Sequence, residues 1–311
     1  MRFRTNNILT AISEGRTSLG VNVQTHSPEL VEMVGHAGYD HVMIDWEHGS
    51  FGTDAVVSMI RAAQYADITP IVRVPSNDEV WIKRVLDAGA LGVVVPHVSN
   101  REQAAAAVAA ARYAADSGTG SRGACPSVRA AEHLTSDWGA FAQWANTNVF
   151  VAVAIESRAG VAALDEILEV SGIDAVFLGT FDLAHEMGYY GDNGAPEVIS
   201  QINSIVDITR RTSTPLFATL YRGRTPEQSR EELDHWKHLG AQVVNTVSDR
   251  RLILQGLRDR LDLLRIEPET DFGDRKKAMT PERTKAPLPP TDVLLNSMRH
   301  EEGRLARHEQ E

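Results

Sequence analysis

The sequence predicts a (β/α)8 TIM barrel, because short β-type runs recur eight times and a helical segment separates each from the next. Several runs, such as "FVAVAI" and "GVVVPHV", are almost continuously apolar and rich in Val and Ile, which is typical of parallel strands buried on both faces. A doubly wound open sheet is the competing fold, but it rarely needs so many regular units. The predicted strands are Ser18–Gln24, His41–Trp46, Pro70–Val74, Gly92–His97, Val149–Glu156, Ala175–Gly179, Pro215–Leu220 and Gln242–Val247.

The segments between these runs carry helix signals. Thr53, Asn77 and Asn100 stand where an N-cap is expected, and Gly89 stands where a helix would stop. The stretch "NREQAAAAVAAARYAA" is rich in alanine, which favours helix. Helix therefore alternates with strand as the barrel requires.

Two regions depart from the alternation. Residues 115–147 insert a Gly/Ser-rich turn and an additional helical stretch before the fifth strand. After residue 265 the composition shifts to proline and charge, as in "EPETDFGDRKKAMTPERTKAPLPP". We therefore expect a barrel domain over residues 1–265, and a C-terminal extension over 266–311 that is partly disordered or forms a docking helix.

Composition narrows the class of partner. The formal net charge of −11 argues against nucleic acid and anionic membrane surfaces, which attract clustered Lys and Arg. The single cysteine, Cys125, favours a cytoplasmic protein without disulfides. We expect no signal peptide and no membrane span, because no apolar run approaches the ~20 residues that a span requires.

Polar residues cluster where the predicted strands end, which is the working face of this fold. Glu156 and Asp182 follow neighbouring strands, and two carboxylates with open positions suit Mg²⁺ or Mn²⁺. A pair of rim carboxylates bridged to arginines is the alternative. Arg73, inside "IVRVP", would be costly in a buried strand unless it is paired or functional. His48, taken alone, is a loop histidine or a general base, and its neighbours Asp45 and Glu47 favour the base.

The sequence lacks the residues that Schiff-base catalysis and the binding of nucleotides or phosphate groups require. No lysine falls at a predicted strand end, so a Schiff-base aldolase is not indicated, whereas metal-assisted stabilisation of an enolate remains open. No G-x-G-x-x-G follows the first strand, and there is no Walker motif or glycine-rich phosphate loop. Neither a dinucleotide nor a phosphorylated substrate is therefore indicated.

The motifs "IDWEHGSFG", "IVRVPSND", "VLDAGALGVVVPHV", "SRGA", "AIES" and "FLGTFDLAHEMGY" occur in the order found in the HpcH/HpaI family, and the chain resembles that family over roughly residues 8–265. The family comprises metal-dependent pyruvate aldolases, among them 4-hydroxy-2-oxoheptanedioate and 2-dehydro-3-deoxyglucarate aldolases. The resemblance implies a homo-oligomer, a hexamer or trimer of dimers, in which subunits exchange the last barrel helix.

The resemblance also implies roles for particular residues. His48 would be the general base, Arg73 would stabilise the enolate oxygen, and Asp87 would raise the basicity of the histidine, within one chain or across a subunit boundary. Asp45 and Glu47 would order the loop. Glu156 and Asp182 would hold Mg²⁺, Mn²⁺ or Co²⁺. The substrate-binding segment would be Gly179, Thr180, Phe181 and Asp182, whose backbone N–H groups would receive the carboxylate of pyruvate or another 2-oxo acid, with an aldehyde as second substrate.

Departures from the family pattern leave the substrate open. Thr180 and Phe181 replace a Pro and a small residue, and Ala154 replaces a glutamine. A related enolate chemistry, citrate-synthase-like or oxaloacetate-dependent, is the first alternative, and an inactive barrel serving as a binding protein is the second. His97 is expected to line the pocket or lie in the core. Arg122 is expected either to meet a distal substrate carboxylate or to cap a loop.

Overall fold

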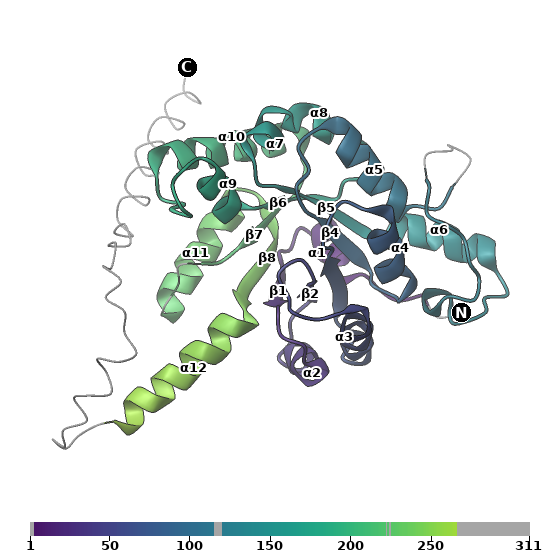
Figure 1. Ribbon diagram of the computed structural model, residues 1–311, viewed down its shortest axis with the longest axis horizontal. Coiled ribbons are helices and arrows are strands. Elements are labelled where there is room, and N and C mark those ends of the chain that lie inside the picture. The colour runs from purple at the N-terminus through teal and green to yellow at the C-terminus, as the bar shows by residue number, and fades with distance from the viewer. Residues whose placement is uncertain (1–2, 115–119, 222, 224, 266–311) are drawn as a thin grey trace.

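The computed structural model describes residues 3–114, 120–221, 223 and 225–265, and its centre is a closed barrel of parallel strands (Figure 1). Each strand pairs with its neighbours in chain order, and β1 closes the ring against β8. The predicted TIM barrel is thus confirmed. The strands are β1 (Ser18–Val23), β2 (His41–Asp45), β3 (Thr69–Arg73), β4 (Gly92–Val95), β5 (Phe150–Ile155), β6 (Ala175–Leu178), β7 (Leu216–Thr219) and β8 (Ala241–Ser248).

Helices surround the barrel on its outer side. Asn100 caps its helix as expected, but the N-caps predicted at Thr53 and Asn77 are each wrong by one residue, because Gly52 and Asp78 occupy those positions. The helices are α1 (Asn7–Ser13), α2 (Pro28–His36), α3 (Thr53–Tyr65), α4 (Glu79–Asp87), α5 (Arg101–Ala111), the short 3₁₀ helix η1 (Arg129–Ala131), α6 (Trp138–Asn148), α7 (Arg158–Ala162), α8 (Leu164–Leu168), α9 (Thr180–Glu186), α10 (Pro196–Thr212), α11 (Pro226–His238) and α12 (Asp249–Leu264).

The alternation of side chains along each strand separates two cores. Along β2, Val42 and Ile44 belong to the large cluster between strands and helices, whereas Met43 belongs to a second cluster inside the barrel. The same alternation turns His41 and Asp45 inward with Met43. Ile8 of α1 is fully buried in the interior cluster, so α1 closes the end of the barrel from which the strands start.

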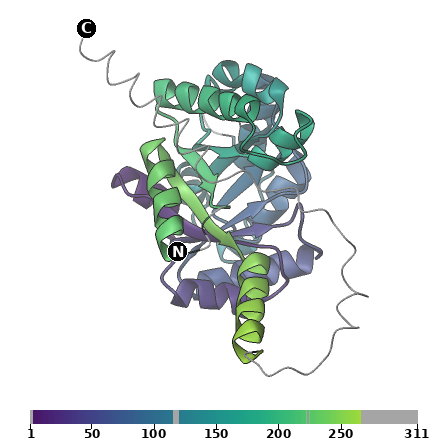
Figure 2. The same ribbon diagram turned by 90° about the vertical axis from the view of Figure 1, so that its left-hand side faces the viewer.

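Two elements extend the basic barrel. The additional helix expected before the fifth strand is α6, while residues 115–119 of that insertion lie outside the described residues. The last helix, α12, runs away from the barrel in both views (Figures 1 and 2). Of its residues only Asp249 is buried. Its exposed apolar side chains are Leu252, Ile253, Leu254, Leu257, Leu261, Leu263 and Leu264.

The extension predicted over residues 266–311 lies outside the described residues. Among the helices that are described, none combines the length and the apolar character needed to cross a lipid bilayer.

Candidate active site

The buried pair of Asp45 and Arg73 forms the base of the site at the carboxyl ends of β2 and β3. These residues stand opposite each other in the sheet register, and both side chains turn into the barrel. Arg73 donates from Nε to Asp45 Oδ1 at 2.9 Å and from Nη2 to Oδ2 at 2.5 Å. Burial opposes the charge on Asp45, but the bonds from Arg73 and Gln24 outweigh it and hold the pKa of this carboxyl below its usual value. Arg73 is thus an oriented, permanent cation.

The turn after β2 follows from the sequence "DWEHG". Gly49 N–H donates to the carbonyl of Asp45 at 2.9 Å, and a Cβ on Gly49 would lie 2.3 Å from that same oxygen. His48 N–H donates to Asp45 Oδ1 at 3.3 Å. Asp45 does order this loop, as expected, but it also holds Arg73. The turn leaves the His48 ring about half exposed at the mouth.

Glu47 joins the arginine to a second group of side chains. Its Oε2 lies 3.2 Å from Arg73 Nη1 and 3.7 Å from His48 Nε2, yet this buried oxygen has no hydrogen-bond partner among the described residues. Burial raises the pKa of Glu47, and Glu156 raises it further, while Arg73 acts in the opposite direction. A cation at this point would relieve both the burial cost and the carboxylate repulsion.

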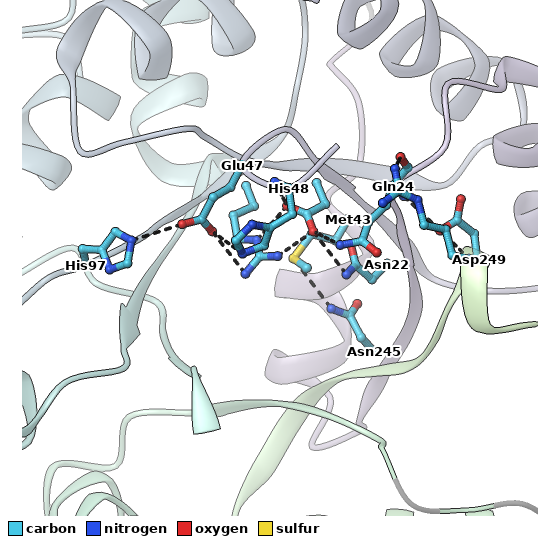
Figure 3. A network of polar contacts seen from close by, with 11 residues as sticks. Asn22, Gln24, Met43, Glu47, His48, His97, Asn245 and Asp249 are labelled. Carbon is cyan, nitrogen blue, oxygen red and sulfur yellow. Dashed lines mark hydrogen bonds and ion pairs between the residues drawn. The ribbon is translucent and has the colours of Figure 1, made fainter. Parts of the chain in front are cut away.

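The second group consists of Glu47, His97 and Glu156 (Glu47 and His97 are labelled in Figure 3). One ligand-type atom from each lies within 4.8 Å of the others. His97 Nδ1 is 2.9 Å from Glu156 Oε1, and His97 Nε2 is 3.3 Å from Glu47 Oε1. His97 neither lies in the core nor simply lines the pocket, since its side chain is 68% exposed and bridges two carboxylates. Two carboxylates and an imidazole fit a divalent metal such as Mn²⁺ or Co²⁺.

The segment from Gly179 to Asp182 approaches the same group from β6. A Cβ on Gly179 would lie 2.3 Å from Glu156 Cβ and 2.7 Å from its Oε2, so only glycine allows this approach. Thr180 and Asp182 lie in the first turn of α9, and Asp182 is outside the group of three. The Phe181 ring is directed to the loop after α9, where it packs over Gly191.

Asp87 lies far from this site within one chain. It is the last residue of α4, which leads into β4, so it stands at the end of the barrel opposite His48. There Arg122 Nη2 donates to Asp87 Oδ1 at 2.8 Å, and the Arg122 guanidinium lies 4.4 Å from the Tyr113 ring centroid. Asp87 and His48 can therefore meet only across a subunit boundary, and Arg122 is engaged within its own chain.

A chain of polar contacts extends from the Asp45–Arg73 pair towards α12, and Figure 3 labels two of its members, Gln24 and Asp249. Gln24 Nε2 donates to Asp45 Oδ2 at 2.8 Å, and both oxygens of Asp249 accept backbone N–H groups at the end of β1. Sequence reasoning placed Gln24 at a strand end without giving it a role. No local pattern marks Asp249, because its partners are more than two hundred residues away in the sequence.

Comparisons with known proteins agree with this geometry. The model of the HpcH/HpaI aldolase/citrate lyase family matches residues 18–248. A 2-dehydro-3,6-dideoxy-6-sulfogluconate aldolase of Pseudomonas putida is 35% identical over 67% of this chain and 79% of the relative. A hydroxypyruvate/pyruvate aldolase of Agrobacterium fabrum is 36% identical over 65% of this chain and 74% of the relative.

Solved structures give the same result. A family protein from Burkholderia cenocepacia J2315 superposes with a TM-score of 0.77 at 28% identity, covering 84% of this chain and all of the other. The citrate synthase SbnG superposes with a TM-score of 0.72 at 29% identity, covering 82% of this chain and 95% of the other. The chain belongs to the HpcH/HpaI aldolase/citrate lyase family.

Proposed function

We propose that this chain is a divalent-metal aldolase that cleaves or forms 4-hydroxy-2-oxo acids through the enolate of pyruvate or a related 2-oxo acid. The observation that carries the proposal is the buried pair of Asp45 and Arg73, joined by a fork of two hydrogen bonds, beside the carboxylates of Glu47 and Glu156 at the barrel mouth. Curated relatives named as hydroxypyruvate/pyruvate and 5-keto-4-deoxy-D-glucarate aldolases support the substrate class.

Arg73 stabilises the negative charge that develops on the keto oxygen when the C3–C4 bond breaks. Because Asp45 fixes the guanidinium in advance, little reorganisation is needed as the charge appears. His48, half exposed at the mouth, moves the proton of the C4 hydroxyl in cleavage and returns it in synthesis. Asp87 of a neighbouring copy would support that base.

The family resemblance implies that Glu156 and Asp182 would hold the cation; Asp182 lies outside the group of Glu47, His97 and Glu156, so Glu47 and His97 would offer further ligand atoms beside Glu156. When bound, a divalent ion draws electron density from the 2-oxo acid and so supplies Lewis-acid assistance to enolate formation. Mg²⁺, Mn²⁺ and Co²⁺ are the candidates. The N–H of Gly179 already donates to the carbonyl of Ile155 at 3.2 Å, so within the segment Gly179–Asp182 the backbone N–H groups after Gly179 would orient the substrate carboxylate at the start of α9.

We also propose a homo-oligomer, a hexamer or trimer of dimers, assembled through α12. That helix exposes seven large apolar side chains and buries only Asp249 within its own chain, and a second copy is the partner that would cover them. The proposed role of Asp87 beside His48 would also call for a neighbouring copy, because Asp87 stands away from its own His48. Light scattering after size exclusion measures the assembly. The single cysteine continues to favour the cytoplasm.

Deuterium exchange into the methyl group of pyruvate, followed by NMR, tests the proposal without knowledge of the aldehyde. We expect exchange with Mg²⁺, Mn²⁺ or Co²⁺ and none after EDTA. Arg73→Ala should lower the rate of pyruvate deuterium exchange roughly 10²- to 10³-fold, as removal of a donor to a developing oxyanion does. Arg211→Ala, at an exposed position on α10, is the matched control. Undiminished exchange in Arg73→Ala would refute the assigned role.

A citrate-synthase-like activity is the second candidate, favoured by the likeness to SbnG. Oxaloacetate supplied with an acyl thioester, with products followed by mass spectrometry, separates the two candidates. A tricarboxylate product without any aldol cleavage would favour the second. A chain that binds no divalent metal and catalyses neither reaction would be a binding protein.

A further inference from the structure

We propose that Asp249 is a positioning residue for the reaction, because it fixes the orientation of Arg73 through Gln24 and Asp45. The inference rests on the function proposed above, in which Arg73 stabilises an enolate. It assigns a role to a residue that begins the outermost helix and touches no reacting atom. Three consecutive links carry it, from Asp249 to the backbone of Gln24, from the Gln24 side chain to Asp45, and from Asp45 to Arg73; Figure 3 labels Asp249 and Gln24.

The first contacts join α12 to the end of β1. Asp249 is 1% exposed, and its Oδ1 and Oδ2 accept the backbone N–H groups of Gln24 at 3.0 Å and Thr25 at 2.9 Å. Arg250 also binds the backbone of Gln24, since its Nη2 donates to the carbonyl of Gln24 at 2.8 Å. A buried carboxylate that accepts such bonds is a strong anchor. The backbone of Gln24 is therefore held on both of its polar groups.

The next contact transmits this order to the site. From its fixed backbone, Gln24 donates through Nε2 to Asp45 Oδ2 at 2.8 Å. The terminal torsion of an aspartate is broad, so a carboxylate is not oriented by its rotamer alone. Gln24 thus selects the rotation of the Asp45 carboxylate in which both oxygens face Arg73. The fork of two bonds from Arg73 to Asp45 then fixes the guanidinium plane.

Capping of α12 does not explain this arrangement. The cap of that helix is Ser248, whose side chain accepts from Arg251 N–H. Asp249 Oδ1 also accepts the backbone N–H of Arg250 at 2.7 Å, but both of its oxygens bond a strand end more than two hundred residues earlier in the chain. Because α12 is also the helix through which we propose that the subunits assemble, its packing in such an assembly would affect the orientation of Arg73.

The experiment replaces Asp249 by asparagine, which keeps the shape but provides one acceptor oxygen instead of two. For the full-length protein loaded with Mn²⁺, we expect kcat for pyruvate deuterium exchange to fall roughly 10- to 100-fold, the range typical of groups that orient an active-site residue, while KM changes less than about threefold. Asp262→Asn, at an exposed position on the same helix, should leave both constants unchanged.

A double-mutant cycle tests whether the effect passes through Gln24. Gln24→Ala should lower kcat to a similar extent, and the variant with both changes should be no slower than the slower single variant. Losses that multiply would overturn the proposal, because they would mean independent roles. An unchanged kcat in Asp249→Asn, together with faster hydrogen exchange at the amides of Gln24 and Thr25, would reduce Asp249 to a structural contact and also overturn it.

A readout without turnover separates this inference from the proposed function. The Nε–H resonance of Arg73, assigned with Arg73→Lys, should shift in Asp249→Asn and in Gln24→Ala but not in Asp262→Asn. If the wild-type protein exchanges no pyruvate deuterium while these shifts appear, the proposed function fails and the positional connection stands. If the wild-type protein is active and the resonance does not move, the connection fails.

Discussion

The two ends of strand β2 carry polar side chains into the same barrel, but they carry them in opposite electrical states. At the start of the strand, His41 is fully buried, with Nδ1 at 2.8 Å from Ser18 Oγ and Nε2 at 3.3 Å from Asn245 Oδ1. Burial is the main effect on its ionisation and lowers the pKa of His41 to about 4, so the ring is neutral at pH 7. At the end of the strand, Asp45 is equally buried and remains charged against Arg73.

The difference shows where this barrel tolerates charge. The histidine end uses neutral partners for both ring nitrogens, which satisfies the buried group without importing an ion. At the aspartate end, Asp45 instead forms an ion pair with Arg73. A neighbouring carboxylate oxygen, Glu47 Oε2, has no hydrogen bond among the described residues. A buried oxygen without a hydrogen bond is tolerable at the mouth, where a cation or a substrate can reach it. The first end belongs to the packed interior, and the second holds the charged residues of the proposed active site.

Breaking the charged end should have the largest effect on stability. Asp45→Ala leaves the Arg73 guanidinium buried without its main partner, and we expect the free energy of unfolding to fall by about 3–5 kcal/mol. Urea unfolding measures it. The control is Asp165→Ala, which breaks an exposed ion pair with Arg211 at 3.2 Å and should cost about 0–1 kcal/mol. Equal losses in the two variants would contradict the contrast between buried and exposed pairs.

The neutral end of β2, which holds His41, should make the free energy of unfolding depend on pH. His41 binds a proton below about pH 6.5 in the unfolded chain, whereas in the folded chain its lowered pKa delays protonation until about pH 4. Folding stability attributable to His41 is therefore complete above pH 6.5 and is lost as the pH falls towards 4, by roughly 3 kcal/mol in total.

Urea unfolding of His41→Gln across the same pH range checks this, because the variant lacks the titrating ring and should lose less stability on acidification than the wild type. His185→Gln, on the exposed side of α9, should retain the wild-type dependence. An unchanged pH dependence in His41→Gln would show that His41 is not the group excluded from protonation.

A smaller effect should follow from filling the close approach beside Glu156. Gly179→Ala places a Cβ 2.3 Å from Glu156 Cβ, so the carboxylate must move, and overpacking of this kind costs about 1–3 kcal/mol. We expect weaker Mn²⁺ binding, measured by calorimetry, together with the loss of stability. Gly139→Ala, whose new Cβ would meet Asp137 at an ordinary 3.7 Å, should alter neither quantity appreciably. Wild-type Mn²⁺ affinity in Gly179→Ala would mean that Glu156 does not contribute to metal binding.

The sequence alone determined the fold class, because alternation of buried strands with capped helices is a local property repeated along the chain. It also predicted that Arg73, His48 and Glu156 lie together at the strand ends, since in a parallel barrel all strands end at one face and a charged residue at such an end is conspicuous. The helix boundaries were predicted less exactly: Asp78 caps α4 in place of its polar neighbour Asn77, and Gly52 precedes α3 without a side-chain cap hydrogen bond, which no polar residue in the sequence could indicate.

Only the tertiary structure decided which of these residues act together. It gave Arg73 its partner in Asp45, brought His97 between Glu47 and Glu156, and placed Asp87 at the opposite end of the barrel. It also joined Asp249 to Gln24. These relations depend on strand register, on side-chain direction and on closure of β1 against β8, which unite distant parts of the chain. A sequence pattern records which residues are present, whereas pairing between distant residues is set by the three-dimensional packing of the whole barrel.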